Sequence, residues 1–116
     1  MCNLFVQMRK MVVTEGNADQ VVKRFSKEGI IEKQEGFIDV NVMVKKVRRG
    51  DEEVIIMVRW ESEKHWKQWE KSPEHIAGHK AKLGQPKPDY IVSSEGALYE
   101  VKAVKKAAPN STVDLV

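Results

Sequence analysis

Residues 37–60 decide the fold, and they read FIDVNVMVKKVRRGDEEVIIMVRW. The two ends of this stretch are rich in Val, Ile and Met, and β-branched residues favour strands. The polar segment Arg49-Gly50-Asp51-Glu52 between them is typical of a tight turn. We therefore predict a β-hairpin with strands over Phe37 to Val47 and Glu53 to Trp60.

Side chains alternate between the two faces of a sheet, so the hairpin can be divided into faces. One face is apolar throughout and holds Ile38, Val40, Val42, Val44, Val54, Ile56, Val58 and Trp60. The other mixes Asp39, Asn41 and Arg59 with Phe37, Met43, Ile55 and Met57. Two helices can cover only one face, so the second apolar surface predicts a homodimer that packs sheet against sheet.

The chain before the hairpin predicts a strand and a helix. Residues Leu4 to Thr14 form an apolar run closed by the turn signal Glu15-Gly16. Asn17 then offers a helix N-cap, and the helix should end near Gly29. Its apolar face at positions i, i+3, i+4 and i+7 consists of Ala18, Val21, Val22 and Phe25.

The chain after the hairpin predicts a helix in two pieces, starting at Ser62 and again at Ser72-Pro73. A loop at Gly84, Pro86 and Pro88 follows, and then strand signals over Tyr90 to Val92 and Ala97 to Val104. The order strand, helix, strand, strand, helix, strand is that of a ferredoxin-like α+β domain. We expect this domain over residues 1–106, with a loose tail over 107–116.

Composition excludes several classes of protein. The chain has 116 residues, enough for one domain, and its net charge of +3 is too small for a nucleic-acid binder. That mild excess still favours a small anionic ligand. The single Cys2 cannot form an internal disulfide, and no run approaches the roughly 18 apolar residues of a membrane span. We expect a cytoplasmic protein with neither a membrane segment nor a secretion signal.

Side chains that could carry chemistry gather between residues 60 and 80. Trp66 and Trp69 are three residues apart, His75 and His79 are four apart, and together they could line one pocket. Core packing of the tryptophans and a solvated or partly buried position of the histidines are the simpler interpretations. Zinc binding is weakly supported, because the Glu of a His-Glu-x-x-His motif is missing.

Other catalytic machinery is absent from the sequence. No serine lies in a Gly-x-Ser-x-Gly turn, Cys2 is terminal, and the glycines are too scattered for a phosphate-binding loop. The acidic pair Glu52 and Glu53 is expected to be a solvated surface. Two interpretations remain: the protein uses a bound prosthetic group, or it has no catalytic activity.

Several segments resemble one known family. Gln68-Trp69-Glu70-Lys71-Ser72 followed by Ala77-Gly78-His79-Lys80 is similar to the Trp and His signature of the IsdG-type heme-degrading monooxygenases, within the antibiotic biosynthesis monooxygenase superfamily. The resemblance extends to Glu35-Gly36-Phe37 and to Val58-Arg59-Trp60-Glu61-Ser62. It covers about Val6 to Tyr99, and the sequence is most similar to the HmoA branch of the family. The resemblance implies a dimeric α+β barrel.

The resemblance also implies residue roles. His79 matches the axial ligand of the heme iron, and Trp69 matches the Trp that presses on the heme face and distorts the macrocycle. Arg9 stands where other members have a catalytic Asn, so it could pair with a heme propionate or donate a hydrogen bond to an iron-bound ligand. Trp66 and His75 complete the predicted cofactor-binding set.

The implied activity makes heme both cofactor and substrate. The ring would be opened with O2 and electrons from an external donor, a reductase or a small reductant, and iron would be released. Two alternatives stay open because fold alone does not determine function. One is a cofactor-free monooxygenase of quinol or phenolic substrates, and the other is a non-catalytic heme-binding protein.

Overall fold

The computed structural model describes residues 4–82 and 88–107. Its elements are β1 (Phe5–Val13), α1 (Ala18–Ser26), the short 3-10 helix η1 (Ile31–Lys33), β2 (Phe37–Val44), β3 (Glu52–Trp60), α2 (Glu63–Glu70), α3 (Pro73–Lys82) and β4 (Ile91–Glu100). The predicted ferredoxin-like order is therefore confirmed.

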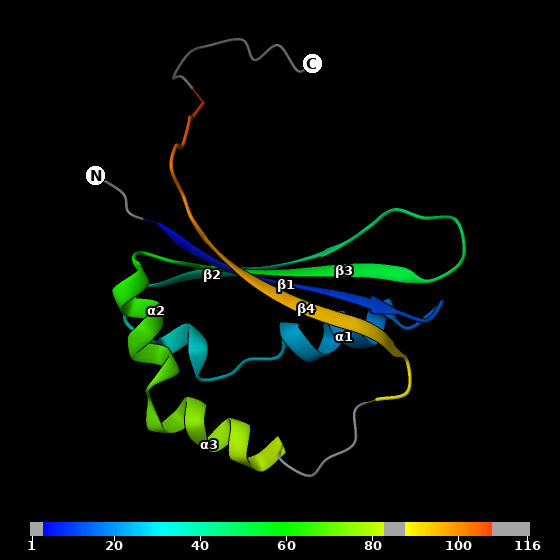
Figure 1. Ribbon diagram of the computed structural model, residues 1–116, viewed down its shortest axis with the longest axis horizontal. Helices are drawn as coiled ribbons and strands as arrows, with labels where there is room; N and C mark the ends of the chain where they lie inside the picture. The colour runs from blue at the N-terminus through cyan, green and yellow to red at the C-terminus, as the bar shows by residue number, and fades with distance from the viewer. Residues whose placement is uncertain (1–3, 83–87, 108–116) are drawn as a thin grey trace.

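The four strands form one antiparallel sheet in the order β2-β3-β1-β4. β1 lies in the interior of the sheet, where Phe5 stands opposite Trp60 of β3 and opposite Glu100 of β4. All the helices lie on one side of the sheet, and α3 stands away from it (Figure 1). The other side of the sheet carries no element of this chain among the described residues.

The core lies between α1 and the sheet. Val13, Val21 and Val54 are at most 1% exposed, and Met11, Ala18 and Ile56 pack with them. Burying a side chain of this size contributes roughly 1.5–3 kcal/mol. The predicted apolar face of α1 is thus confirmed.

A β-bulge changes the predicted faces at the start of β2. Phe37 pairs with Trp60 and Asp39 with Arg59, so one extra residue of β2 opposes the shorter segment of β3. Phe37 consequently lies on the face covered by the helices, with its ring 5.7 Å from that of Trp60 and edge-on to it. The prediction that Phe37 shares a face with Asp39 was wrong because a bulge breaks the two-residue period.

The start of α1 is capped from outside the helix. Asn17 makes no side-chain cap, and its amide donates instead to Thr14 Oγ1. Glu52 Oε1 accepts hydrogen bonds from the backbone N–H groups of Gly16, at 3.0 Å, and Ala18, at 2.9 Å. Asn17 therefore occupies the predicted N-cap position, but Glu52 and not Asn17 supplies the side-chain cap. The interpretation of Glu52 as merely solvated was wrong.

Three element boundaries also differ from the predictions. α1 ends at Ser26 rather than near Gly29, because Lys27 takes an extended conformation. β2 ends at Val44 rather than Val47.

The third difference concerns the last strand. The two predicted strand segments are one continuous strand, β4, which ends at Glu100, because residues between them pair with β1, for example Gly96 with Arg9. Cys2, Gly84, Pro86 and the tail from residue 108 lie outside the described residues. Within those described, no helix is both long and apolar enough to cross a membrane.

Candidate functional site

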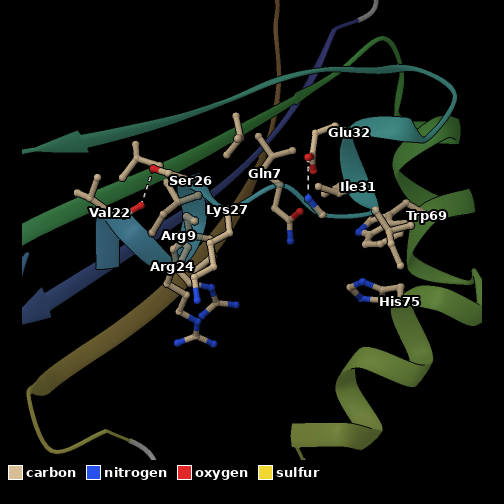
Figure 2. A pocket seen from close by; sticks show the side chains of 17 residues that line it. Gln7, Arg9, Val22, Arg24, Ser26, Lys27, Ile31, Glu32, Trp69 and His75 are labelled. Atoms are coloured by element: carbon tan, nitrogen blue, oxygen red, sulfur yellow. Dashed lines mark hydrogen bonds between the residues drawn. The ribbon is translucent and has the colours of Figure 1, made fainter. Parts of the chain in front are cut away.

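A cavity of about 760 Å³ opens on the helix side of the sheet, a volume typical of small-molecule sites. Its floor is apolar and is formed by sheet residues Val40, Val42, Ile56 and Val58. Its walls come from α1, the segment through η1, and the junction of α2 with α3 (Figure 2). The cavity therefore combines an apolar floor with walls from several elements.

Three cationic side chains gather on one side of the cavity. Arg9 comes from β1, Arg24 from the last turn of α1, and Lys27 follows that helix (Figure 2). Arg9 Nη1 donates a hydrogen bond to Ser94 Oγ at 2.9 Å. No carboxylate lies within ion-pair distance of these three cations in the described part of the chain. This side of the cavity is suited to an anion.

One carboxylate, Glu32, lines the rim. The backbone N–H of Gly29 donates to Glu32 Oε2 at 2.7 Å, and this hydrogen bond lowers the pKa of the Glu32 carboxyl. Glu32 therefore carries its negative charge at neutral pH, and its backbone partner holds it in place.

The opposite side of the cavity is aromatic. Trp69 and His75 line it, with ring centroids 4.8 Å apart and ring planes inclined at 64°. Ser72 joins the two helices that carry them: its hydroxyl donates to the carbonyl of Trp69 at 2.7 Å and accepts from the N–H of His75 at 3.2 Å. The predicted break between the helical pieces brings these side chains to one wall.

His79 lies one turn beyond His75 on α3. Their Nε2 atoms are 2.9 Å apart, and His75 Nε2 is also 3.0 Å from Glu70 Oε2. His79 is exposed and does not itself line the cavity. Two imidazoles and one carboxylate thus meet beside the aromatic wall.

The predicted site residues are brought together except for one. Arg9, Trp69 and His75 line the same cavity, and His79 contacts His75. Trp66 instead packs against Phe5, with ring centroids 5.2 Å apart, and does not line the cavity.

Sequence reasoning missed five polar lining residues, namely Gln7, Arg24, Ser26, Lys27 and Glu32. Gln7 is two positions before Arg9, so the strand period alone places both on one face. Arg24 and Lys27 carry no comparable signal, because only the packing of α1 on the sheet turns them toward Arg9.

The fold and motifs agree with a family model. The model described as antibiotic biosynthesis monooxygenase matches residues 4–81. The chain belongs to the antibiotic biosynthesis monooxygenase family. The resemblance drawn from its motifs is thereby confirmed.

Relatives of this monooxygenase-family chain include the heme-degrading monooxygenase HmoA of Bacillus subtilis, which is 67% identical over 92% of this chain and 99% of the relative. A crystal structure from Bacillus cereus described as an antibiotic biosynthesis monooxygenase has 52% identity and a TM-score of 0.80, covering 90% of this chain and 99% of that one. The heme-degrader MhuD of Mycobacterium tuberculosis, solved with two hemes bound, shares the fold at 18% identity with a TM-score of 0.62, covering 88% and 99%.

Proposed function

We propose that this chain is a heme-degrading monooxygenase. One observation carries the proposal: a single cavity joins an apolar floor, a cationic side, and an aromatic side next to two imidazoles. Heme needs these three environments, because it has a flat apolar macrocycle, two anionic propionates and an iron that imidazole ligates. The name of the 67% identical relative, heme-degrading monooxygenase, supports the same activity.

The cationic cluster of Arg9, Arg24 and Lys27 would hold the propionates. Arg guanidinium groups suit carboxylates because their planar donors match the two oxygens, and Lys adds a compact charge. None of the three is neutralised by a carboxylate within the described residues, so each can pair with the ligand. Arg9 would thus pair with a heme propionate, one of the two roles that its position in the sequence suggested.

The imidazole side would hold the iron. His79 is the proposed axial ligand, and His75, in contact with both His79 and Glu70, would orient it. Trp69 would press on the macrocycle from the wall it shares with His75. When bound, heme supplies the iron that activates O2 with electrons from an external donor.

We also propose that the chain works as a homodimer with a dimeric α+β barrel. The uncovered face of the sheet carries apolar side chains that pair across β1, β3 and β4, namely Met8 with Met57 and Ala97. Tyr99 of β4 lies on the same face, opposite Val6, which is already buried. Tyr99 is 51% exposed and Met43, on β2, is 43% exposed. A second sheet would bury this surface.

The test is to add one equivalent of hemin and record the visible spectrum, then add ascorbate in air. A Soret band should form and then disappear as iron becomes chelatable. His79→Ala should abolish the band, whereas the matched control His65→Gln should keep it, because His65 hydrogen-bonds Ser62 away from the cavity.

Each other outcome contradicts part of the proposal. A band that forms and persists with ascorbate would indicate a non-catalytic heme-binding protein. Absence of any band would indicate the cofactor-free oxidation of quinols or phenols. A band retained in His79→Ala and lost in His75→Ala would move the ligand role to His75.

A further inference from the structure

Gln7 occupies a distinctive place in the cavity. It lies on β1 opposite Val58 of β3 and Leu98 of β4, two residues before Arg9 on the same face of the sheet. Its side chain points into the space between the cationic cluster and the wall formed by Trp69 and His75 (Figure 2). Its amide therefore stands over the apolar floor.

The side-chain amide of Gln7 makes no hydrogen bond to the described residues, whereas three other polar residues of the cavity are hydrogen-bonded within the protein. Arg9 donates to Ser94, Ser26 donates to the carbonyl of Val22, and Glu32 accepts from Gly29. No hydrogen bond joins the Gln7 side chain to another of the described residues, and Gln7 is the one carboxamide among the described residues that line the cavity.

When a ligand fills the cavity, the side-chain amide of Gln7 needs a new hydrogen-bond partner. Gln7 is only half-buried, so water can satisfy it while the cavity is open. A ligand that displaces this water must supply the hydrogen bond, because an unpaired buried polar group is costly. The floor residue Val58 opposite Gln7 cannot supply one.

We propose that Gln7 donates a hydrogen bond to the small ligand carried by the heme iron. The inference rests on the proposed function. An iron held by a histidine of α3 would have its other face turned away from that helix, toward the space into which Gln7 points (Figure 2). Hydrogen-bond donors on that face help to determine whether heme iron only binds O2 or activates it. Arg9 would then bind a propionate, and Gln7 would orient the ligand.

Fluoride binding to the ferric heme complex tests this role without turnover, because bound fluoride accepts a hydrogen bond. Gln7→Leu keeps a similar volume and removes the amide. Its fluoride affinity should fall roughly 3- to 10-fold, the effect of one neutral hydrogen bond. Its hemin affinity should stay within about threefold of the wild type, because the hydrogen bond is to the ligand and not to heme.

Gln20→Leu is the matched control, since Gln20 is exposed on α1 and bonds to Asn17 outside the cavity. Unchanged fluoride affinity in Gln7→Leu, or loss of its hemin binding, would overturn the proposal. A fall in fluoride affinity in Arg9→Met but not in Gln7→Leu would assign the hydrogen bond to Arg9. Failure of the proposed function is distinguishable, because the wild type itself would then either form no Soret band or form one that persists with ascorbate in air.

Discussion

At the scale of single residues, Glu52 shows how one carboxylate can join distant parts of the chain. It is the first residue of β3, yet its Oε1 accepts from two backbone N–H groups at the turn before α1. The first N–H groups of a helix have no partner within the helix, and a negative charge near them is favourable. Glu52 therefore fixes where α1 begins and, with it, the helix that carries Arg24.

Glu52→Ala should lower the free energy of unfolding by about 1–2 kcal/mol, the usual cost of losing a helix cap. Urea denaturation followed by circular dichroism measures this change. Glu53→Ala is the matched control, because Glu53 only pairs with the partly exposed Lys10 at 3.6 Å, and such pairs contribute less than about 1 kcal/mol. Equal losses in the two variants would contradict the capping role.

At the scale of elements, the junction of α2 and α3 determines one wall of the cavity. Ser62 caps α2 through the N–H of His65, and Ser72 makes the equivalent bond to His75 at the start of α3. Only Ser72 also bonds back to the preceding helix, at the carbonyl of Trp69. The angle between the helices, and hence the placement of the histidines, depends on Ser72.

Ser72→Ala and Ser62→Ala should each lower stability by about 1 kcal/mol, because each removes an N-cap. Ser72→Ala should weaken hemin binding severalfold more than Ser62→Ala does, because it also removes the side-chain hydrogen bond that links the start of α3 to the Trp69 carbonyl of α2. Parallel hemin titrations followed at the Soret band would measure both affinities. Equal hemin affinities in the two variants would show that the junction does not position the site.

At the scale of the whole molecule, the uncovered sheet face combines apolar and charged groups. Arg59 Nε donates to Asp39 Oδ1 at 2.8 Å, and this hydrogen bond from Arg59 lowers the pKa of the Asp39 carboxyl. Met57 lies on the same face, opposite Met8 of β1 and Asn41 of β2. A second sheet packed here would bury the methionines and enclose a charge pair that is already neutralised internally.

Met57→Asp should convert the proposed dimer to a monomer, because it places an unpaired charge at the centre of the interface. Light scattering at micromolar concentration measures the mass. Gln68→Asp adds the same charge on the exposed side of α2 and should leave the dimer intact. A wild-type protein with the mass of one chain would contradict the dimer outright.

The sequence alone determined the order of the elements and much of their extent, because hydrophobic period, caps and turns are local properties. The caps at Ser62 and Ser72 and the apolar face of α1 were predictable for this reason. Family motifs also selected Trp69 and Arg9, which line one cavity.

Only the tertiary structure decided features that depend on residues far apart in the chain. Three such features depend on contact with another element. They are the helix cap supplied by Glu52, the bulge that turns Phe37 onto the helix side, and the joining of the two predicted segments into β4. Packing between elements also groups Arg24 and Lys27 with Arg9 and places Gln7 over the cavity floor. It likewise keeps Trp66 out of the cavity, against Phe5. Local sequence sets what an element is, whereas packing sets which side chains it presents to a ligand.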